Sequence, residues 1–367
     1  MPIAKIHRIS ATSPDDTGGI EAAIAAGRLD PKGIVAILGK TEGNGCVNDF
    51  SRGFATQSLL MMLQKFLPDN EARKVCLVMS GGTEGGMAPH WTVFERGDGN
   101  APPQGAALAV GRAHTPPLPF EHLGRLAQVE QVAAGVRAAM ADAGIDDPAA
   151  VHFVQIKCPL LTLQRIAEAD ARGRQVATCD TLRSMGLSRA ASALGVAVGL
   201  NEIARERLDE RQIGADWAVW SGRASCSAGI ELLNHEIVVL GMSPQWSGAL
   251  AIDHAVMTDA IDVEPVRAAL RRLGFAAHGQ LAPPDRARVL AVLSKAEASH
   301  DGLLRGHRHT MLDDSDISST RHARAFVCGA LAGLIGHAEI YVSGGAEHQG
   351  PDGGGPVALI VNRDAAA

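Results

Sequence analysis

The sequence contains six cysteines in 367 residues, and none of them belongs to a CxxC pair. They are scattered along the chain as Cys46, Cys76, Cys158, Cys179, Cys226 and Cys328. Disulfide-rich secreted domains and zinc sites both need paired or closely spaced cysteines. The spacing therefore disfavours both classes and predicts free, mostly buried thiols in a reducing compartment.

The chain also lacks a long hydrophobic run and a cluster of positive charge. No segment approaches the roughly 18 apolar residues of a membrane span, and the start MPIAKIHRISATSPDD has no apolar core of signal-peptide length. The net charge is -6, and basic residues gather only in short pairs such as Arg271 and Arg272. Surfaces that bind nucleic acid or anionic lipid need concentrated positive charge. We therefore expect a cytoplasmic protein with no nucleic-acid or membrane partner, whose ligand is a small molecule.

Three familiar motifs are begun but not completed. A Gly-Lys-Thr segment at residues 39–41 resembles the end of a phosphate-binding loop, but that motif requires a glycine where the chain has Ile34. A dinucleotide fingerprint starting at Gly43 and Gly45 fails at Asn48. No histidine pair takes the HExxH form of zinc proteases. We therefore predict no nucleotide-binding loop and no zinc site.

What the sequence does have is an internal repeat. Three apolar runs rich in aliphatic and β-branched residues each finish on a lysine, the pattern of a buried strand with a polar end. They are GIVAILGK ending at Lys40, VHFVQIK ending at Lys157 and RVLAVLSK ending at Lys295. Each follows a segment rich in Ala, Arg and Glu that predicts a helix. With 46% hydrophobic residues, the chain has ample material for the cores of all three copies.

Two further elements recur downstream of each lysine. An arginine opens a helix-like apolar pattern in SRGFATQSLL, SRAASALGVAV and ARAFVCGALAG, and a strand then leads into SGGTE, SAGIE and SGGAE. The aligned residues are Arg52, Arg189 and Arg324, followed by Ser80, Ser227 and Ser343. We expect the strands AALAVGRAH, EIVVLGMSP and VALIVNRD to close the three copies.

The order of lysine, arginine and serine is the same in every copy, whereas the spacing varies, so insertions fall in loops. The predicted units are residues 1–105, 112–248 and 253–363, with TPPLPFEH and SPQWSG near the joints. Each should be a small layer of strands backed by helices, giving an α+β fold. Because the period is far longer than that of a solenoid, we expect three α/β units with pseudo-threefold symmetry around one central active site.

The recurring polar residues indicate a shared functional site, since packing gives no reason to keep them in three otherwise diverged copies. A serine hydroxyl becomes a nucleophile when an adjacent base takes its proton, and a neutral lysine is such a base. Burial and nearby arginines both depress a lysine pKa. The small turn after each serine also exposes backbone N–H groups able to hold an oxyanion. Three such sets match a small ring with three alternating carbonyl and N–H groups.

On these motifs the chain resembles the cyanuric acid hydrolases, a family of cyclic amide hydrolases that also includes barbiturases. The resemblance spans essentially the whole chain and rests on the lysine strands, the arginine motifs, and SGGTEGG, SAGIE and SGGAEHQGPDGGGP. It implies three related domains in one chain and an enzyme that opens the s-triazine ring of cyanuric acid to carboxybiuret. It also implies a homotetramer without an organic cofactor.

The resemblance implies that Ser227 is the nucleophile and Lys157 its base. Composition alone leaves Ser225 and Cys226 open as nucleophiles, and the Ser-x-x-x-Glu register selects Ser227. The middle turn has Ala228 where the other two have glycine, so we expect three chemically unequal sectors. The resemblance further implies a substrate-binding set of Lys40, Arg52, Ser80, Gly81, Arg189, Ser227, Ala228, Lys295, Arg324, Ser343 and Gly344.

A structural divalent cation, magnesium or calcium, is also implied near the C-terminal turn. Its ligands would be the carboxylate of Glu297 and backbone oxygens of Ala346, Gln349, Gly350, Pro351 and Gly354. Hard cations take such oxygen ligands. Read without the resemblance, this segment is a loop rich in Gly and Pro.

Two alternative functions stay open at this point. A barbiturase would open a pyrimidine ring of similar shape with the same machinery, and discrimination would depend on the hydrogen-bond partner of one sector. A non-catalytic cyclic-amide-binding protein would hold the ring without opening it. The insertion at residues 300–316, which carries His300, His307, Asp313 and Asp314, fits either a cover over the pocket or a surface segment.

Overall fold

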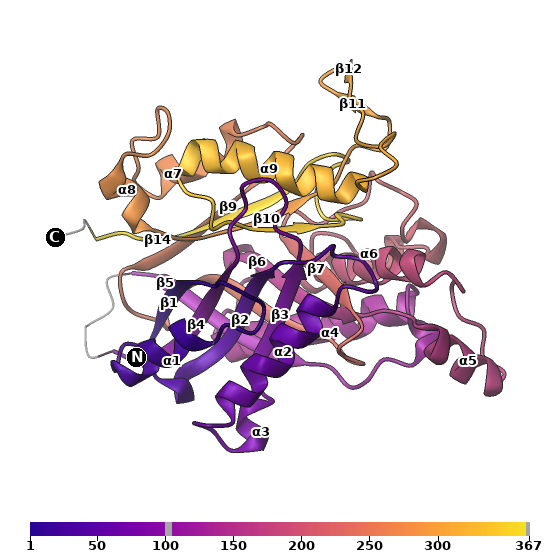
Figure 1. Cartoon of the computed structure of the whole chain (residues 1–367), viewed down its shortest axis with the longest axis horizontal. Helices are drawn as coiled ribbons and strands as arrows, with labels where there is room; N and C mark the ends of the chain where they lie inside the picture. The colour runs from indigo at the N-terminus through magenta and orange to yellow at the C-terminus, as the bar shows by residue number, and fades with distance from the viewer. Residues whose placement is uncertain (100–104, 365–367) are drawn as a thin grey trace.

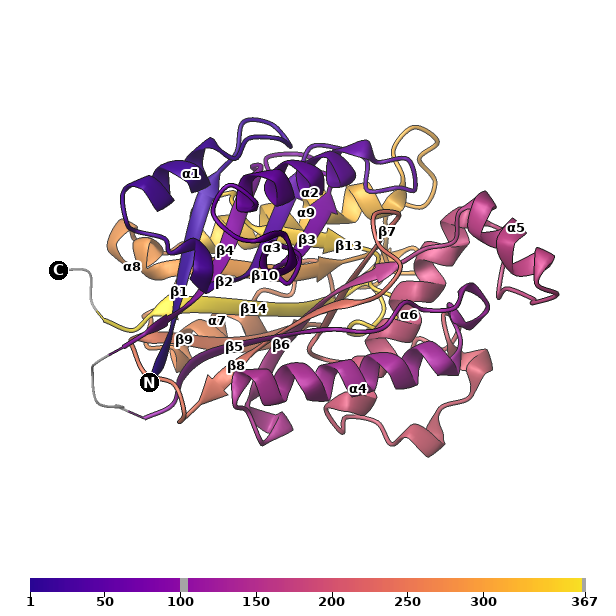
Figure 2. The ribbon, with the colours of Figure 1, turned by 90° about the horizontal axis from the view of Figure 1, so that it is seen from below.

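The computed structural model describes residues 1–99 and 105–364, which form three four-stranded sheets with helices around them. The sheets lie together in the middle of the molecule, and the helices cover their outer faces (Figure 1, Figure 2). These sheets and helices confirm the mixed α/β fold expected from the sequence. Within the described residues, no helix is both long enough and apolar enough to cross a bilayer.

Each sheet has its own strands and helices. The first sheet has the order β1 (Pro2–Ser10), β4 (His90–Asp98), β2 (Ile34–Thr41), β3 (Cys76–Gly81), with helices α1 (Gly18–Ala25), α2 (Phe50–Leu63) and α3 (Asp69–Ala72). The middle sheet has the order β5 (Ala107–His114), β8 (Glu236–Ser243), β6 (Val151–Pro159), β7 (Ala224–Gly229), with helices α4 (Leu126–Ala143), α5 (Leu163–Ala171) and α6 (Thr181–Gly199).

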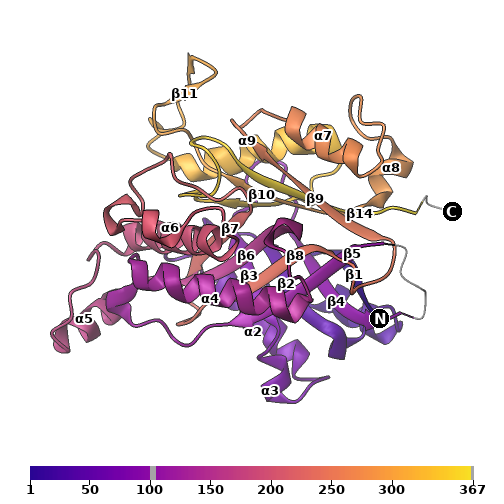
Figure 3. The same cartoon turned by 180° about the vertical axis from the view of Figure 1, so that it is seen from behind.

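The third sheet has the order β9 (Leu250–Met257), β14 (Gly355–Asn362), β10 (Val289–Ala296), β13 (Tyr341–Gly344). Its helices are α7 (Glu264–Arg272), α8 (Pro283–Arg288) and α9 (Ser319–Ile335), seen above it in Figure 3. The insertion forms a small hairpin of β11 (Leu303–Leu304) and β12 (His307–Arg308) that projects from this layer. In each sheet the central lysine strand is parallel to the serine strand and antiparallel to its other neighbour.

The strand pairing corrects one expectation. AALAVGRAH does not close the first copy, because β5 pairs with β8 and is the outer strand of the middle sheet. The strand that closes the first sheet is β4, HWTVFERGD, which pairs with both β1 and β2. Its charged residues hide it in a hydrophobicity reading, yet Glu95 is fully buried and accepts hydrogen bonds from Lys5 and His7.

The alternation of side chains along the central strands positions the site. In β2, Ala36 and Leu38 face a core shared by all three sheets, whereas Ile37 faces the first sheet's own helices. Successive strand residues point to opposite faces, so Lys40 continues the inward-facing series. The same parity carries Lys295 inward behind Leu293. The lysine strands therefore deliver their charged ends to the centre of the molecule.

The arginine motif does not mark a helix start in every copy. Asp49 caps α2 by accepting from Ser51 N, which places Arg52 in the first turn. In the middle copy, Asp180 caps α6 by accepting from Arg183 N, so that Arg189 lies in the middle of the helix. The small residues before Arg189 hid this earlier start, whereas an Asp before the first helical residue is a usual N-cap.

Candidate functional site

Three buried lysines meet at the centre, and each is bound to a different sheet from its own. Every Nζ donates a hydrogen bond to the carbonyl that directly precedes a serine of the next sheet. The three bonds are Lys40 to Val342 O at 2.8 Å, Lys157 to Met79 O at 2.7 Å and Lys295 to Cys226 O at 2.9 Å. These carbonyls lie on sheet-edge strands and need a donor. The lysines thus join the three sheets in a closed cycle.

Each lysine also lies beside the serine of its own sheet, but only two of the pairs are hydrogen-bonded. Lys40 Nζ lies 3.2 Å from Ser80 Oγ, and Lys295 Nζ lies 3.1 Å from Ser343 Oγ. Lys157 is paired in register with Ser227. Among the described residues, however, it makes no hydrogen bond to that hydroxyl, and its Nζ lies 2.8 Å from Glu231 Oε1.

The glutamates that follow the serines show the same asymmetry. Glu84 binds Arg324, and Glu347 binds Arg189 through two hydrogen bonds of 2.8 and 2.6 Å. By the same cycle Glu231 would bind Arg52. Instead, Arg52 donates to Ala228 O at 2.8 Å and to Cys46 O at 2.6 Å. The middle sector therefore has a lysine–glutamate pair where the others have arginine–glutamate pairs.

Burial lowers the pKa of all three lysines. For Lys40 the pKa lies well below its usual value, mainly because of burial and then because of Arg324. Burial, followed by Arg189, lowers the pKa of Lys295 to about 7. Burial lowers the pKa of Lys157 as well, while Glu231 opposes this shift. A neutral lysine, the form needed in a base, is therefore accessible at this site.

The serines and arginines surround a small recess with a cavity volume of about 20 Å³. All nine predicted binding residues other than the lysines line it, together with Gly45 and Met185: Arg52, Ser80, Gly81, Arg189, Ser227, Ala228, Arg324, Ser343 and Gly344. Lys40, Lys157 and Lys295 are fully or almost fully buried and lie next to these serines in register. The structure therefore brings together every predicted residue of the ring-binding site.

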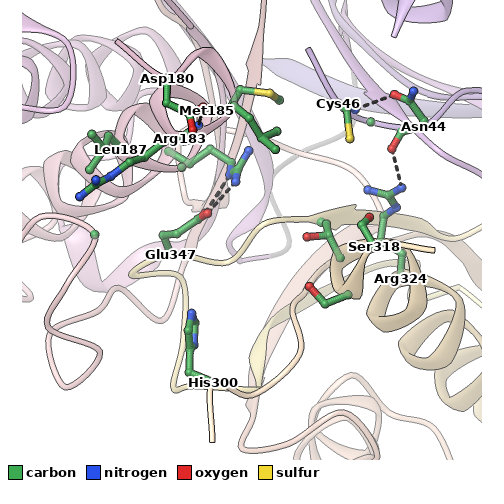
Figure 4. A pocket seen from close by; sticks show the side chains of 18 of the residues that line it. Asn44, Cys46, Asp180, Arg183, Met185, Leu187, His300, Ser318, Arg324 and Glu347 are labelled. Atoms are coloured by element: carbon green, nitrogen blue, oxygen red, sulfur yellow. Dashed lines mark hydrogen bonds and ion pairs between the residues drawn. The ribbon is translucent and has the colours of Figure 1, made fainter. Parts of the chain in front are cut away.

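The recess adjoins a larger cavity of about 520 Å³ that provides the approach to it. Figure 4 shows residues from all three sheets' connections around this cavity, with Asn44 and Cys46 on one side, Asp180 to Leu187 on another, and His300 and Glu347 below. His300, from the insertion, stacks on Trp217 with ring centroids 3.8 Å apart. His300 therefore lines the approach, whereas His307, Asp313 and Asp314 are exposed.

Comparison with known proteins decides the family. The model of the amidohydrolase ring-opening proteins matches residues 5–362. The chain belongs to this family. It is 66% identical over 363 residues to a cyanuric acid amidohydrolase of Azorhizobium caulinodans, covering 99% of each chain. It is 62% identical over 364 residues to a cyanuric acid amidohydrolase of Bradyrhizobium sp. (strain ORS 375), covering 98% of each.

Solved structures of ring-opening amidohydrolases have the same fold. A cyanuric acid hydrolase from A. caulinodans superposes with a TM-score of 0.93 at 66% identity, covering 99% of both chains. A second cyanuric acid hydrolase, described as an evolutionary innovation by structural concatenation, has a TM-score of 0.93 at 48% identity. It covers 99% of this chain and 100% of its own.

The difference between glycine and alanine in the three turns has a steric cause. A Cβ added at Gly81 would lie 1.7 Å from Oδ2 of Asp49, and one at Gly344 would lie 2.4 Å from Cγ2 of Thr320. Asp49 stands three residues before Arg52, and the same position in the middle copy is Gly186. The middle turn, by contrast, accommodates the methyl group of Ala228, which is almost fully buried.

Sequence reasoning missed several residues of this site in the ring-opening amidohydrolase. Gly45, in the left-handed region at φ 72°, and Met185 line the recess without belonging to a repeated motif. Glu236, opposite Lys157 in register, is half-buried and accepts a hydrogen bond from Leu77 N, and desolvation raises its pKa to about 8. The glutamates of the Ser-x-x-x-Glu motif were visible, and their repetition was the available signal for a role as charge partners.

The predicted metal ligands lie on two adjoining segments. Glu297 directly follows β10, and Ala346 to Gly354 form the turn between β13 and β14. Burial, and then the charge of Glu347, raise the pKa of Glu297. The turn is tightly held: Gly350 has φ 92°, and a Cβ there would lie 2.7 Å from Cα of Gly355. A half-buried carboxylate beside a compact loop of carbonyls fits a hard cation.

Proposed function

We propose that this protein is a cyanuric acid amidohydrolase that opens the s-triazine ring hydrolytically to carboxybiuret. The observation that carries the proposal is the recess where three serines from the three sheets and three arginines from the helices α2, α6 and α9 converge. Cyanuric acid has three carbonyls alternating with three N–H groups, so a site with three sets of serine and arginine donors matches it. High identity to two enzymes named cyanuric acid amidohydrolase supports the same conclusion.

The proposal includes three repeated units with pseudo-threefold symmetry around this recess. The shared strand order of the three sheets and the closed cycle of lysine bonds support it. We assign the units to residues 1–105, 112–248 and 253–363, and the pairing of β5 with β8 argues for extending the second unit back to Ala107. We further expect a cytoplasmic homotetramer. Light scattering in solution measures the mass of the assembly and so tests the number of chains.

The middle sector is the proposed catalytic one. Lys157 Nζ takes the proton of Ser227 Oγ, and this oxygen attacks a ring carbonyl. Backbone N–H groups of the turn stabilise the oxyanion. The C–N bond then breaks, the leaving nitrogen takes the proton from Lys157, and water hydrolyses the acyl-enzyme to carboxybiuret. Among the described residues, Ser80 and Ser343 are hydrogen-bonded by Lys40 and Lys295 and Ser227 is not bonded to a lysine, which sets the middle sector apart from the other two.

The three arginines are the proposed holders of the ring. In Arg189 and Arg324 the Nε and Nη2 atoms bind a glutamate, which fixes the guanidinium plane. Within the described part of the chain, Nη1 of each is left to donate to a ring carbonyl. Lys40 and Lys295 hold Ser80 and Ser343 so that the two non-reacting sectors bind rather than attack.

One assay tests the function against its alternatives by following loss of cyanuric acid and of barbituric acid side by side. We expect turnover of cyanuric acid with kcat/KM at least about 100-fold above that for barbituric acid, because an unmatched polar partner discriminates strongly. Preference for barbituric acid would make the protein a barbiturase. Tight binding of either ring without turnover, measured by calorimetry, would make it a non-catalytic binding protein.

We also propose that Glu297 and the turn of residues 346–354 hold a structural magnesium or calcium ion. Its role is to compensate the negative charges of Glu297 and Glu347 and to hold the turn whose Gln349 accepts a hydrogen bond from Cys226 N at 2.6 Å. Chelation should lower Tm by several degrees, since ion binding to the folded state alone stabilises it, and added Mg²⁺ or Ca²⁺ should restore it.

Glu297→Gln is the matched variant for the cation. It removes the charge but keeps the shape, so its Tm should be insensitive to chelator and to added cation. An unchanged wild-type Tm after complete removal of bound divalent ions, verified by elemental analysis, would contradict the proposal.

A further inference from the structure

Two of the three junctions between sheets are held by the same contact. Arg8 of β1 donates from Nη1 to Val289 O at 3.0 Å, and Arg112 of β5 donates from Nη1 to the corresponding Ile34 O at 3.3 Å and to Val35 O at 3.2 Å. These acceptors lie at the irregularity near the start of a central lysine strand, where the register with its antiparallel neighbour shifts. Each arginine thus reaches from one sheet to the backbone beside a bulge in the next.

At the third junction the corresponding carbonyl, Val151 O, accepts from Arg223 of the middle unit itself at 3.1 Å, and the facing strand β9 carries a histidine in place of the arginine. His254 of β9 occupies the position that Arg8 and Arg112 occupy in the other two sheets. In the third sheet, Leu293, two residues before Lys295, pairs with Ala358, and Ala358 pairs with His254. The same two steps lead from Lys40 to Arg8 and from Lys157 to Arg112. The bulged residue it faces is His152 of β6, where the other lysine strands have Val35 and Leu290. At this junction, therefore, both the position on the outer strand and the bulged position that it faces are histidines.

The two imidazoles lie close enough to share a ligand. Nδ1 of His152 is 2.9 Å from Nδ1 of His254 and 3.5 Å from Oδ1 of Asp253. One ligand atom from each of these three residues lies within 4.8 Å of the other two. In a tetrahedral zinc site with bonds near 2.0 to 2.1 Å, neighbouring ligands lie about 3.3 Å apart. The two measured separations fall on either side of that value.

We propose that His152, Asp253 and His254 form a second metal site, for a borderline transition cation such as Zn²⁺ or Co²⁺, that ties β6 of the middle sheet to β9 of the third. Two imidazoles and one carboxylate leave a fourth position for water. The side chains of His152 and Asp253 are 20% and 14% exposed, so an ion can enter while most of the site is shielded.

The surroundings supply an outer shell for such an ion. Arg272 of α7 binds Oδ2 of Asp253 at 2.6 Å, which orients Oδ1 towards the histidines, as outer-shell partners orient metal ligands. The other nearby guanidinium, Arg223, is neutralised by Glu202 at 2.9 Å.

This site is separate from the catalytic residues and from the proposed hard-cation site. His152 precedes Lys157 by five residues on one strand, a distance of about 16 Å at the rise of an extended strand. Nitrogen ligands select borderline transition ions, whereas carbonyl and carboxylate oxygens suit magnesium or calcium. The proposed role is therefore structural, joining two sheets where the other junctions use an arginine.

The test is a Co²⁺ titration of tag-free, chelator-treated full-length protein in excess Mg²⁺ and Ca²⁺, which saturate the oxygen site. We expect one Co²⁺ per chain with d–d absorption and a Tm that rises with added ion. The double variant His152→Leu/His254→Arg rebuilds the pattern of the other two junctions. It should fold and open the ring at the wild-type rate, but lose both the absorption and the Tm shift.

Two further variants keep the test decisive if the double variant does not fold. Asp253→Asn should weaken Co²⁺ binding at least about tenfold, whereas His307→Ala, in the exposed β12 hairpin, should leave it unchanged. Wild-type protein that shows no d–d band, or a band that persists at full intensity in His152→Gln, overturns the proposal.

Discussion

Ser227→Ala is expected to lower kcat for ring opening of cyanuric acid by about 10⁴-fold or more. The variant removes the oxygen that attacks the carbonyl, and loss of a covalent nucleophile costs several orders of magnitude even where the rest of the site is intact. Ligand binding should be nearly unchanged, because the three arginines and the other two serines are untouched. Steady-state kinetics together with calorimetric binding of the ring measure the two quantities separately.

The repeated architecture supplies the matched controls. Ser80→Ala and Ser343→Ala remove chemically identical hydroxyls at the corresponding register positions, beside Lys40 and Lys295. They should raise KM and lower kcat by roughly 10²- to 10³-fold at most, the range for one lost hydrogen-bond donor. A larger loss in either of these variants than in Ser227→Ala would move the nucleophile to another sector.

Cys226 is the control for the competing nucleophile. It is fully buried on the opposite face of β7 from Ser227, and burial raises its thiol pKa well above its usual value. Thiolate is the reactive form, so this thiol is inert. Cys226→Ala should keep most of the activity, whereas an inactive but folded Cys226→Ala protein would favour the thiol.

The recess could be predicted because its residues are polar, repeated and placed at strand ends. One buried strand that ends on a lysine says little, but three such strands in one chain indicate a shared role for the lysines. Because side chains alternate between the two faces of a strand, the inward-facing residues before Lys40 and Lys295 then predict that these lysines also point inward. The serines follow in the same way from the parallel pairing of neighbouring strands. Local pattern and global fold agree at these positions.

Contacts between units could not be predicted in this way. The bonds from Lys157 to Met79 O and from Lys40 to Val342 O join sheets whose mutual placement no single-strand pattern specifies. The strand β4 was missed because Glu95 reads as a surface charge until its partners Lys5 and His7 are known. The pairing of Glu231 with Lys157, rather than with Arg52, likewise depends on the packed geometry.

Lys157 is expected to be nearly as indispensable as Ser227. Lys157→Arg keeps a positive charge and a donor for Met79 O, but a guanidinium stays protonated and cannot act as a base. We therefore expect kcat/KM to fall by about 10³-fold or more, within the usual range for loss of a general base and its partner interactions. Lys40→Arg and Lys295→Arg, measured in the same way, should lose much less.

The charge of Glu231 distinguishes a catalytic base from a lysine that only holds structure. Lys157 must be neutral to take the serine proton, so kcat/KM should rise with pH through its pKa. The carboxylate of Glu231, 2.8 Å away, stabilises the ammonium form and raises that pKa. Glu231→Gln removes this stabilisation, and the rising limb of the pH profile should shift to lower pH by about a unit or more.

The corresponding glutamates show whether the shift belongs to Lys157. Glu84 and Glu347 bind Arg324 and Arg189 and act on Lys40 and Lys295. If Lys157 is the base, Glu84→Gln and Glu347→Gln will weaken ring binding, since each frees the arginine it orients, but will leave the rising limb in place. A shift in either variant, with none in Glu231→Gln, would assign the proton transfer to another sector.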